Sequence, residues 1–227
     1  MSEVKALLRK YSVAKDAQLE EGKVNKLDIY RSDLGELLTT YYFEEKLPAG
    51  KRYIIPLKNI SSRETTGQPG RGIDAIGYKQ DEDGKVHLLL AEAKVSSQQQ
   101  NPPDVVDKTK DSIYATHKKH HNDTAYLLDK LSSYVRKLGA KDMRVMLSLI
   151  LQIEHNNTDK YSVTYGCGLV RDETCVKTPE DYGKMQTLAA DFQPGDVDFV
   201  IFSFTEHTID EAVLMFYNKV KELANGK

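Results

Sequence analysis

The 227-residue sequence has no tryptophan and only two cysteines, Cys167 and Cys175. Two cysteines are too few for the disulfide framework of a small secreted protein, so we expect reduced thiols. No apolar run approaches the roughly 20 residues that a membrane-spanning helix needs. The first 23 residues also lack the continuous apolar region of a signal peptide. These absences argue against secretion and membrane insertion, and they favour a cytoplasmic protein.

An excess of positive charge is also missing. Lysine and arginine number 32 against 34 aspartate and glutamate residues, which gives a formal net charge of -2. No global basic field therefore draws the protein onto nucleic acid, and any DNA binding must rest on local patches or on a partner. Hydrophobic residues make up 40% and charged residues 29%, which is typical of a soluble globular protein with a substantial core.

Hydrophobic periodicity predicts one α/β domain over residues 1–227, in which residues 1–30 form a peripheral N-terminal extension. The expected strands are 52–60 at a sheet edge, 72–80, 86–96, 143–154, 160–170 and 196–206. The expected helices are 33–46, 104–139 with a break near 120–123, 178–192, and a last one from 208. The first and last of these helices start with capping-box patterns, Asp33 with Glu36 and Thr208 with Glu211. This order of elements predicts a mixed sheet with helices on both faces.

The segment LLLAEAKVSS places two charged residues at the end of an apolar strand. Side chains alternate along a strand, so Glu92 and Lys94 share one face. With a five-residue loop at 81–85, Asp74 of the preceding strand lies directly opposite Glu92. A loop one residue shorter would pair Asp74 with Ala91 instead. In the first register, two carboxylates and a lysine meet at the end of a hairpin.

Two adjacent carboxylates repel each other, and one of them tends to keep a proton unless a cation neutralises the pair. Oxygen ligands without Cys or His favour a hard ion, so Asp74 and Glu92 predict a Mg²⁺ site that Mn²⁺ could also fill. The ion would polarise a phosphoryl oxygen and lower the pKa of a water, and Lys94 would orient that water or offset charge in the transition state. This combination suits the hydrolysis of a phosphodiester.

The spacing Asp–x17–Glu–x–Lys on a predicted hairpin resembles the PD-(D/E)xK nuclease superfamily, with Ile73 in place of the usual proline. The segments RSDLGELLTTYY, GRGIDAIGY and LLLAEAKVSS together resemble the nuclease subunit of the bacterial Hachiman antiphage system. The resemblance implies a restriction-endonuclease-like core. It also implies a Mg²⁺-dependent DNA endonuclease of the bacterial cytoplasm, which works with a separate helicase subunit and uses Asp74, Glu92 and Lys94.

Glu36 is a further candidate, because many nucleases of this superfamily use an acid on the first core helix as an additional metal ligand. The alternative is that Glu36 only caps its own helix together with Asp33. On a regular helix, Glu36 would point away from the apolar stripe, which consists of Leu34, Leu37, Leu38 and Tyr41.

Other interpretations of the charged residues stay open. The hairpin charges could form a surface salt bridge, and the domain could be a catalytically silent adaptor that binds a helicase or another partner. The substrate could also be RNA or a nucleotide. His117, His120 and His121 have the helical spacing for a shared ion or could belong to a solvated basic face. Basic residues between 108 and 137 could contact phosphates, although acidic residues dilute them.

Overall fold

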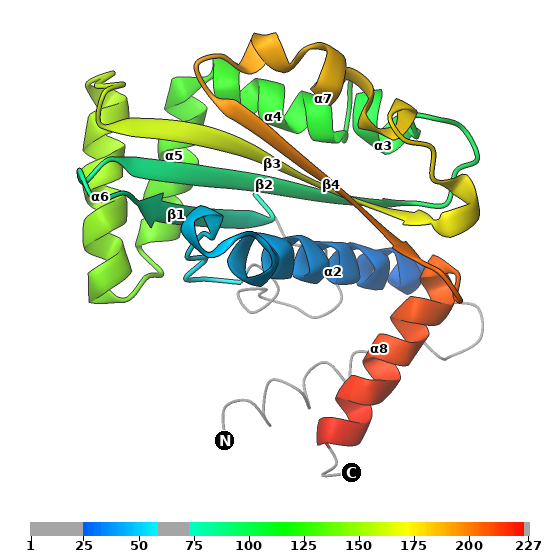
Figure 1. Ribbon diagram of the computed structural model, residues 1–227. Helices are drawn as coiled ribbons and strands as arrows, with labels where there is room; N and C mark the ends of the chain where they lie inside the picture. Colours follow the sequence, from blue (N-terminus) through cyan, green and yellow to red (C-terminus); the bar gives the residue numbers. More distant parts are fainter. Residues whose placement is uncertain (1–24, 59–72, 225–227) are drawn as a thin grey trace.

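The computed structural model describes residues 25–58 and 73–224, and Figure 1 shows them as a sheet between layers of helices. The strands of this part of the chain are β1 (Ala75–Gln80), β2 (Val86–Ser96), β3 (Tyr161–Asp172) and β4 (Asp196–Phe204). They lie side by side in that order. β1 pairs with β2 antiparallel, whereas β2, β3 and β4 are parallel. The prediction of an α/β fold with a mixed sheet is confirmed.

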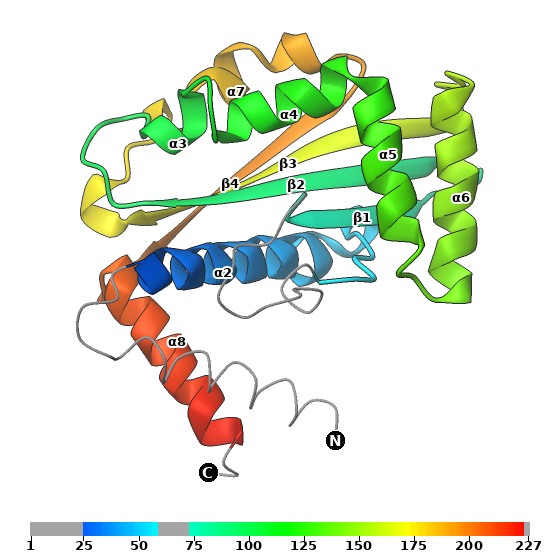
Figure 2. The same ribbon diagram turned by 180° about the vertical axis from the view of Figure 1, so that it is seen from behind.

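Helices cover both faces of the sheet, as predicted. One face carries α2 (Asn25–Tyr41) and the C-terminal α8 (Ile209–Ala224). The other carries α3 (Asp104–Asp107), α4 (Ile113–Asn122), α5 (Thr124–Val135), α6 (Ala140–Glu154) and α7 (Gly183–Thr187), which Figure 2 shows from behind. Short turns are η1 (Tyr42–Lys46), η2 (Ala49–Lys51), η4 (Glu173–Cys175), η5 (Glu180–Tyr182) and η6 (Ala189–Phe192). Within the described residues, none of the helices has both the length and the apolar character to cross a membrane.

Helix α2 starts earlier than predicted and turns a different face to the sheet. Because it begins at Asn25, Asp33 lies inside the helix, where its carboxylate accepts a hydrogen bond from the Tyr217 hydroxyl at 2.8 Å instead of capping. The predicted apolar stripe is wrong in part, since Tyr41 is half exposed and the buried positions include Glu36 and Thr39. A Cβ added to Gly168 of β3 would lie 1.9 Å from Thr39 Oγ1, so only glycine allows so close a contact between helix and strand.

The last six residues of the predicted N-terminal extension belong to a helix. Residues 1–24 of the extension lie outside the described residues. Residues 25–30 belong to α2, and Tyr30 is buried with its ring centroid 4.4 Å from that of Tyr217 on α8. Tyr30 is therefore part of the domain core and is not peripheral.

The predicted strand at 143–154 is wrong, because these residues belong to helix α6. Met146, Leu149 and Ile153 recur with helical spacing and are buried, whereas Leu147 and Leu151 are about half exposed. A run of this composition fits a buried strand or a helix, and apolar residues on both sides of the helix hid its period. The chain therefore passes from β2 to β3 through four consecutive helices, α3 to α6.

The other helical predictions hold with local differences. The predicted helical stretch 104–139 has the expected break at Asp123, a further break at 108–112, and an earlier end at Val135. Asp123 caps α5 by accepting a hydrogen bond from Tyr126 N at 2.9 Å. The predicted helix 178–192 is instead three short turns, η5, α7 and η6, and Gly183 at φ +50° separates the first two. The capping box of α8 is confirmed, since Thr208 N donates to the Glu211 carboxylate at 2.8 Å.

The predicted edge strand at 52–60 reduces to one bridge in the part that the structure describes. Ile54 pairs with Tyr78 of β1 through two backbone hydrogen bonds of 2.7 and 2.9 Å. Residues 59 and 60 lie outside the described residues. The segment still extends the sheet beyond β1, at the edge where Pro56 follows.

Candidate functional site

The pairing of β1 with β2 has the predicted register, in which Ala75 lies opposite Ala91. The next pair along the ladder is Asp74 and Glu92. Asp74 precedes the first residue of β1, and its Oδ2 accepts a hydrogen bond from Ala93 N at 2.8 Å. The carboxylate thus satisfies a backbone donor of β2 that β1 no longer reaches. This hydrogen bond holds Asp74 beside Glu92, as the sequence predicted.

Glu92 and Lys94 lie on the face of the sheet that α3 to α6 cover. Leu90, with the same side-chain direction, belongs to the core cluster that includes residues of α4, α5 and α6. The alternate residues face α2, since a Cβ on Gly35 would lie 2.8 Å from Val95. The apolar strand therefore ends in two charged residues on its α3–α6 face, and both are largely buried.

The charges at this end of β2 form a connected set. Lys94 Nζ lies 3.1 Å from Glu92 Oε1 and 2.7 Å from Asp111 Oδ1. The Glu92 side chain is 7% exposed, the Lys94 side chain 18% and the Asp111 side chain 90%. A surface salt bridge, the alternative left open by the sequence, does not describe a glutamate with so little solvent contact. The Glu92–Lys94 pair is a buried ion pair with an exposed acid at its outer end.

Burial is the main reason why the pKa of Glu92 lies well above its ordinary value, and the nearby charge of Asp74 raises it further. Lys94 offsets only part of this effect. Burial alone would lower the pKa of Lys94, but the charges of Glu92 and Asp111 outweigh it and raise that pKa. Lys94 therefore stays protonated at neutral pH and acts as a cation and hydrogen-bond donor, not as a base.

Asp74 and Glu92 fit a hard divalent cation. Mg²⁺ commonly takes only one or two carboxylates from a protein and completes its shell with waters and substrate phosphates. A cation between the two acids would also remove the repulsion that raises the pKa of Glu92. Within residues 25–58 and 73–224, no three His, Cys, Asp or Glu side chains form a group that could hold a metal ion.

Glu36 is not brought to this pair in the structure. It is 4% exposed on α2, which packs on the opposite face of the sheet, and Ser32 Oγ donates to its Oε1 at 3.5 Å. The interpretation of Glu36 as an N-terminal cap with Asp33 is wrong, because both residues lie inside α2. Its role as a metal ligand stays a prediction.

Comparison with known families tests the resemblance to the Hachiman subunit. A family model described as HamA matches residues 2–220, nearly the whole chain. The chain belongs to the HamA family. Membership makes it a component of a Hachiman antiphage system. No curated protein and no solved structure matches the chain.

In this member of the HamA family, the segment that follows Lys94 is fixed from inside the fold. Arg171 of β3 is fully buried, and its guanidinium donates to the backbone carbonyls of Gln98 at 2.7 Å and Gln100 at 3.1 Å. Asp181 lies 3.6 Å from Arg171 Nε and is also fully buried. These contacts hold the chain that leaves β2 directly after the candidate site. The sequence did not predict the Arg171–Asp181 pair. Arg171 lies on a strand and Asp181 on a short turn ten residues later, and no local sequence pattern links two such positions.

His117 and His120 of α4 have a structural role. His117 and His120 are 0% and 4% exposed, and His117 Nε2 lies 2.9 Å from the carbonyl oxygen of Gly166. Burial lowers the pKa of His117 to about 3 and that of His120 to about 4, so both are neutral at pH 7. They belong neither to a metal group of the described chain nor to a solvated basic face, so both predictions for these two residues are wrong.

Proposed function

We propose that this chain is the metal-dependent DNA endonuclease of its Hachiman system and that a helicase-type subunit delivers its substrate. The observation that carries the proposal is the arrangement of Asp74, Glu92 and Lys94 at the end of the β1–β2 hairpin. A buried glutamate with a raised pKa, beside a second carboxylate and a protonated lysine, is an unfavourable arrangement for a purely structural site. It suits a site that binds a cation and a phosphodiester.

Asp74 and Glu92 would hold the ion, and Glu36 is the candidate for a further ligand. When bound, Mg²⁺ or Mn²⁺ would polarise the scissile phosphate and lower the pKa of the attacking water. The protein fixes the two carboxylates in advance, Asp74 by its hydrogen bond to Ala93 N and Glu92 by its place inside β2. Such preorganisation avoids the cost of arranging the ligands during the reaction.

Lys94 would contact the phosphate or the attacking water. Because its pKa is raised, it carries its positive charge through the reaction and can stabilise negative charge that develops in the transition state. Its side chain is 18% exposed, so the ammonium group can be reached from the side of Asp111. The exposed Asp111 then acts as the counter-charge that substrate phosphate would replace.

A partner for DNA delivery is expected from the charge of the chain. A formal net charge of -2 gives little attraction to a duplex, and we expect the isolated chain to bind DNA only in the non-specific range of about 10⁻⁴–10⁻⁶ M at physiological salt. A helicase that holds the DNA would supply the missing affinity. Both binding and cleavage should therefore strengthen when the partner subunit is added.

Plasmid cleavage by the chain with its partner, in Mg²⁺, Mn²⁺ or EDTA, tests the proposal. Lys94→Met should slow cleavage about 100- to 1,000-fold, which is typical for loss of a group that stabilises transition-state charge, and Glu92→Gln should reduce it at least as much. Glu154→Gln, at an exposed position on α6, is the matched control and should keep full activity. Cleavage that persists in Glu92→Gln, or that needs no metal, would refute the assignment. RNA in place of DNA identifies the substrate class, and binding of the partner without cleavage would support a silent adaptor.

A further inference from the structure

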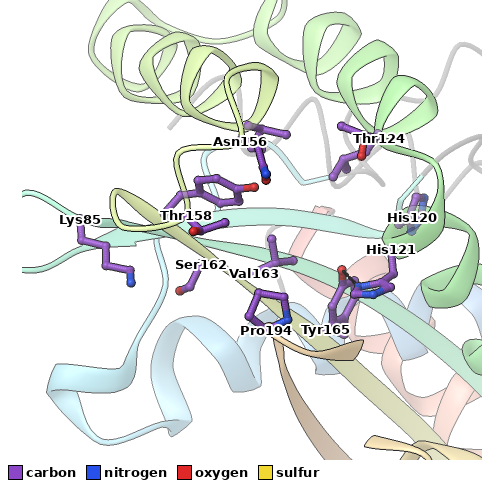
Figure 3. A pocket seen from close by; sticks show the side chains of 14 residues that line it. Lys85, His120, His121, Thr124, Asn156, Thr158, Ser162, Val163, Tyr165 and Pro194 are labelled. Atoms are coloured by element: carbon purple, nitrogen blue, oxygen red, sulfur yellow. Dashed lines mark hydrogen bonds between the residues drawn. The ribbon is translucent and has the colours of Figure 1, made fainter. Parts of the chain in front are cut away.

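A second candidate site lies at the opposite end of β2 and β3. A pocket of about 380 Å³ opens where the α4–α5 junction, the end of α6, the start of β3 and Pro194 meet (Figure 3). This volume is within the range of about 300–1,000 Å³ that is typical of small-molecule sites. Lys85 at its edge and Glu92 are seven residues apart, or about 20 Å at the rise of an extended strand. The pocket is therefore separate from the Asp74–Glu92 pair.

The chemistry of the lining favours an anion. Among the described residues, no aspartate or glutamate lines the pocket, although Asp and Glu make up 34 of the 227 residues of the chain. Lys85 supplies a positive charge to the lining. Its backbone N–H donates to Asp81 Oδ1 at 2.8 Å, whereas its ammonium group forms no ion pair with a carboxylate of the described residues. Neutral hydrogen-bonding groups complete the wall, among them Thr124, Asn156, Thr158 and Ser162. Such a wall offers donors to an anion without a competing negative charge.

The pocket has two chemically different sides. In Figure 3, Lys85, Ser162 and Thr158 lie on one side, and His121 and Tyr165 lie on the other. The Tyr165 hydroxyl is 3.0 Å from His121 Nδ1, and the two ring centroids are 5.7 Å apart, so the rings are held together. The Ser162 hydroxyl is already 2.8 Å from His87 Nδ1, and Tyr165 is only 3% exposed. One side thus presents the Lys85 cation and the Thr158 hydroxyl, and the other presents the His121 ring.

We infer that this pocket binds a nucleoside phosphate. The phosphate would lie at Lys85 and Thr158, which supply an ammonium group and a hydroxyl donor. The base would lie against His121, the more exposed of the two rings, which the Tyr165 hydroxyl holds in place through Nδ1. A free nucleotide and the 5′-phosphorylated end of a strand share this chemistry. The inference does not depend on the proposed nuclease site.

Titration calorimetry and thermal shift on the intact chain test this inference. The probes are AMP, GMP, CMP, UMP, adenosine, and one trinucleotide with and without a 5′-phosphate. Lys85→Gln should weaken binding of the phosphorylated probe about 10- to 100-fold, as expected for loss of a charge-assisted hydrogen bond, and Lys85→Arg should retain it. Lys141→Gln, an exposed lysine at the start of α6, is the control and should bind like the unmodified chain.

The probes separate the two sources of the ligand. Binding of a mononucleotide alone identifies a free nucleotide, and binding of the phosphorylated trinucleotide identifies a strand end; either supports the pocket. Equal binding of adenosine and AMP, unchanged binding in Lys85→Gln, or no binding of any probe would overturn the inference. Because these readouts are affinities, the result is independent of whether the chain cleaves DNA.

Discussion

Glu92 and Asp181 are both buried carboxylates beside a buried cation, and they differ in what else surrounds them. Asp181 Oδ1 accepts a hydrogen bond from Asn101 Nδ2 at 2.7 Å, and Oδ2 accepts one from Lys177 N at 2.9 Å. Arg171 lies 3.6 Å away as its counter-charge. Glu92 has Lys94 as its cation but a second acid, Asp74, as its neighbour. One carboxylate is surrounded by donors, and the other shares its site with a like charge.

The two cations differ in the same way. The Arg171 guanidinium donates to four backbone carbonyl groups, those of Ser96, Gln98, Gln100 and Cys175. Within the described part of the chain, the Lys94 ammonium group instead contacts side-chain acids, and one of them is 90% exposed. Arg171 gives these hydrogen bonds to backbone carbonyl groups, so the donors that form them are not available to a ligand. The Arg171–Asp181 pair therefore stabilises the fold, whereas the Glu92–Lys94 pair is the one that our proposal makes available to substrate.

The comparison predicts that Arg171→Met is the most damaging change to stability. It removes the charge that faces Asp181 and leaves carbonyl groups without donors, so the free energy of unfolding should fall by about 3–5 kcal/mol. Urea denaturation measures the loss. Asp181→Asn tests the partner, and a double-mutant cycle should give strong coupling between the two positions. A loss below 1 kcal/mol in Arg171→Met would show that the pair is not the anchor inferred here.

Glu92→Gln should have the opposite effect on stability in the absence of metal. The pKa of Glu92 in the folded chain lies above its value of about 4.3 in the unfolded chain. Protonated Glu92 therefore contributes its full share to the free energy of unfolding below about pH 4.3, and this share is lost as the pH rises through the folded pKa. At pH 8 the wild-type chain carries the repulsion with Asp74, which glutamine removes. We expect the variant to gain about 1 kcal/mol, or about 2–4 °C in Tm, at pH 8.

The pH and the metal provide the controls for that measurement. The gain in Tm should shrink toward pH 5, where protonation relieves the wild-type chain of the same repulsion. Mg²⁺ should raise the Tm of the wild-type chain more than that of Glu92→Gln, since binding to the native state alone is stabilising. A lower Tm for the variant at pH 8 would mean that the attraction to Lys94 outweighs the repulsion from Asp74.

Local patterns were sufficient to predict the hairpin part of the candidate site. The alternation along β2 and the length of the 81–85 loop together fix which side chains of two adjacent strands meet, so Asp74 and Glu92 could be paired from sequence. The α6 error arose where both sides of a helix carry leucine, because a short apolar run then loses its period. Composition also suggested a peripheral start to the chain, although Tyr30 packs on α8.

Local sequence patterns could not predict the contacts between separate elements of the fold. Arg171 and Asp181 meet because η5 folds back against the end of β3, and neither residue type signals its burial in advance. Asp111 meets Lys94 only because the turn between α3 and α4 places it there, with φ at +51°. From sequence, Asp111 appeared only as one of the acids that dilute the basic segment.

Asp111→Asn should have the smallest effect. Asparagine tolerates the left-handed backbone conformation at φ +51°, so the change removes the charge without straining the turn. The lost ion pair is exposed on the aspartate side and should cost at most about 1 kcal/mol of stability. Lys94 keeps Glu92 as its partner and stays protonated, so single-turnover cleavage should change by less than about tenfold, which corresponds to 1.4 kcal/mol. Comparing this rate with that of Lys94→Met decides the role of Asp111. A loss in Asp111→Asn as large as that in Lys94→Met would show that Asp111 takes part in the chemistry and is not a counter-charge that substrate replaces.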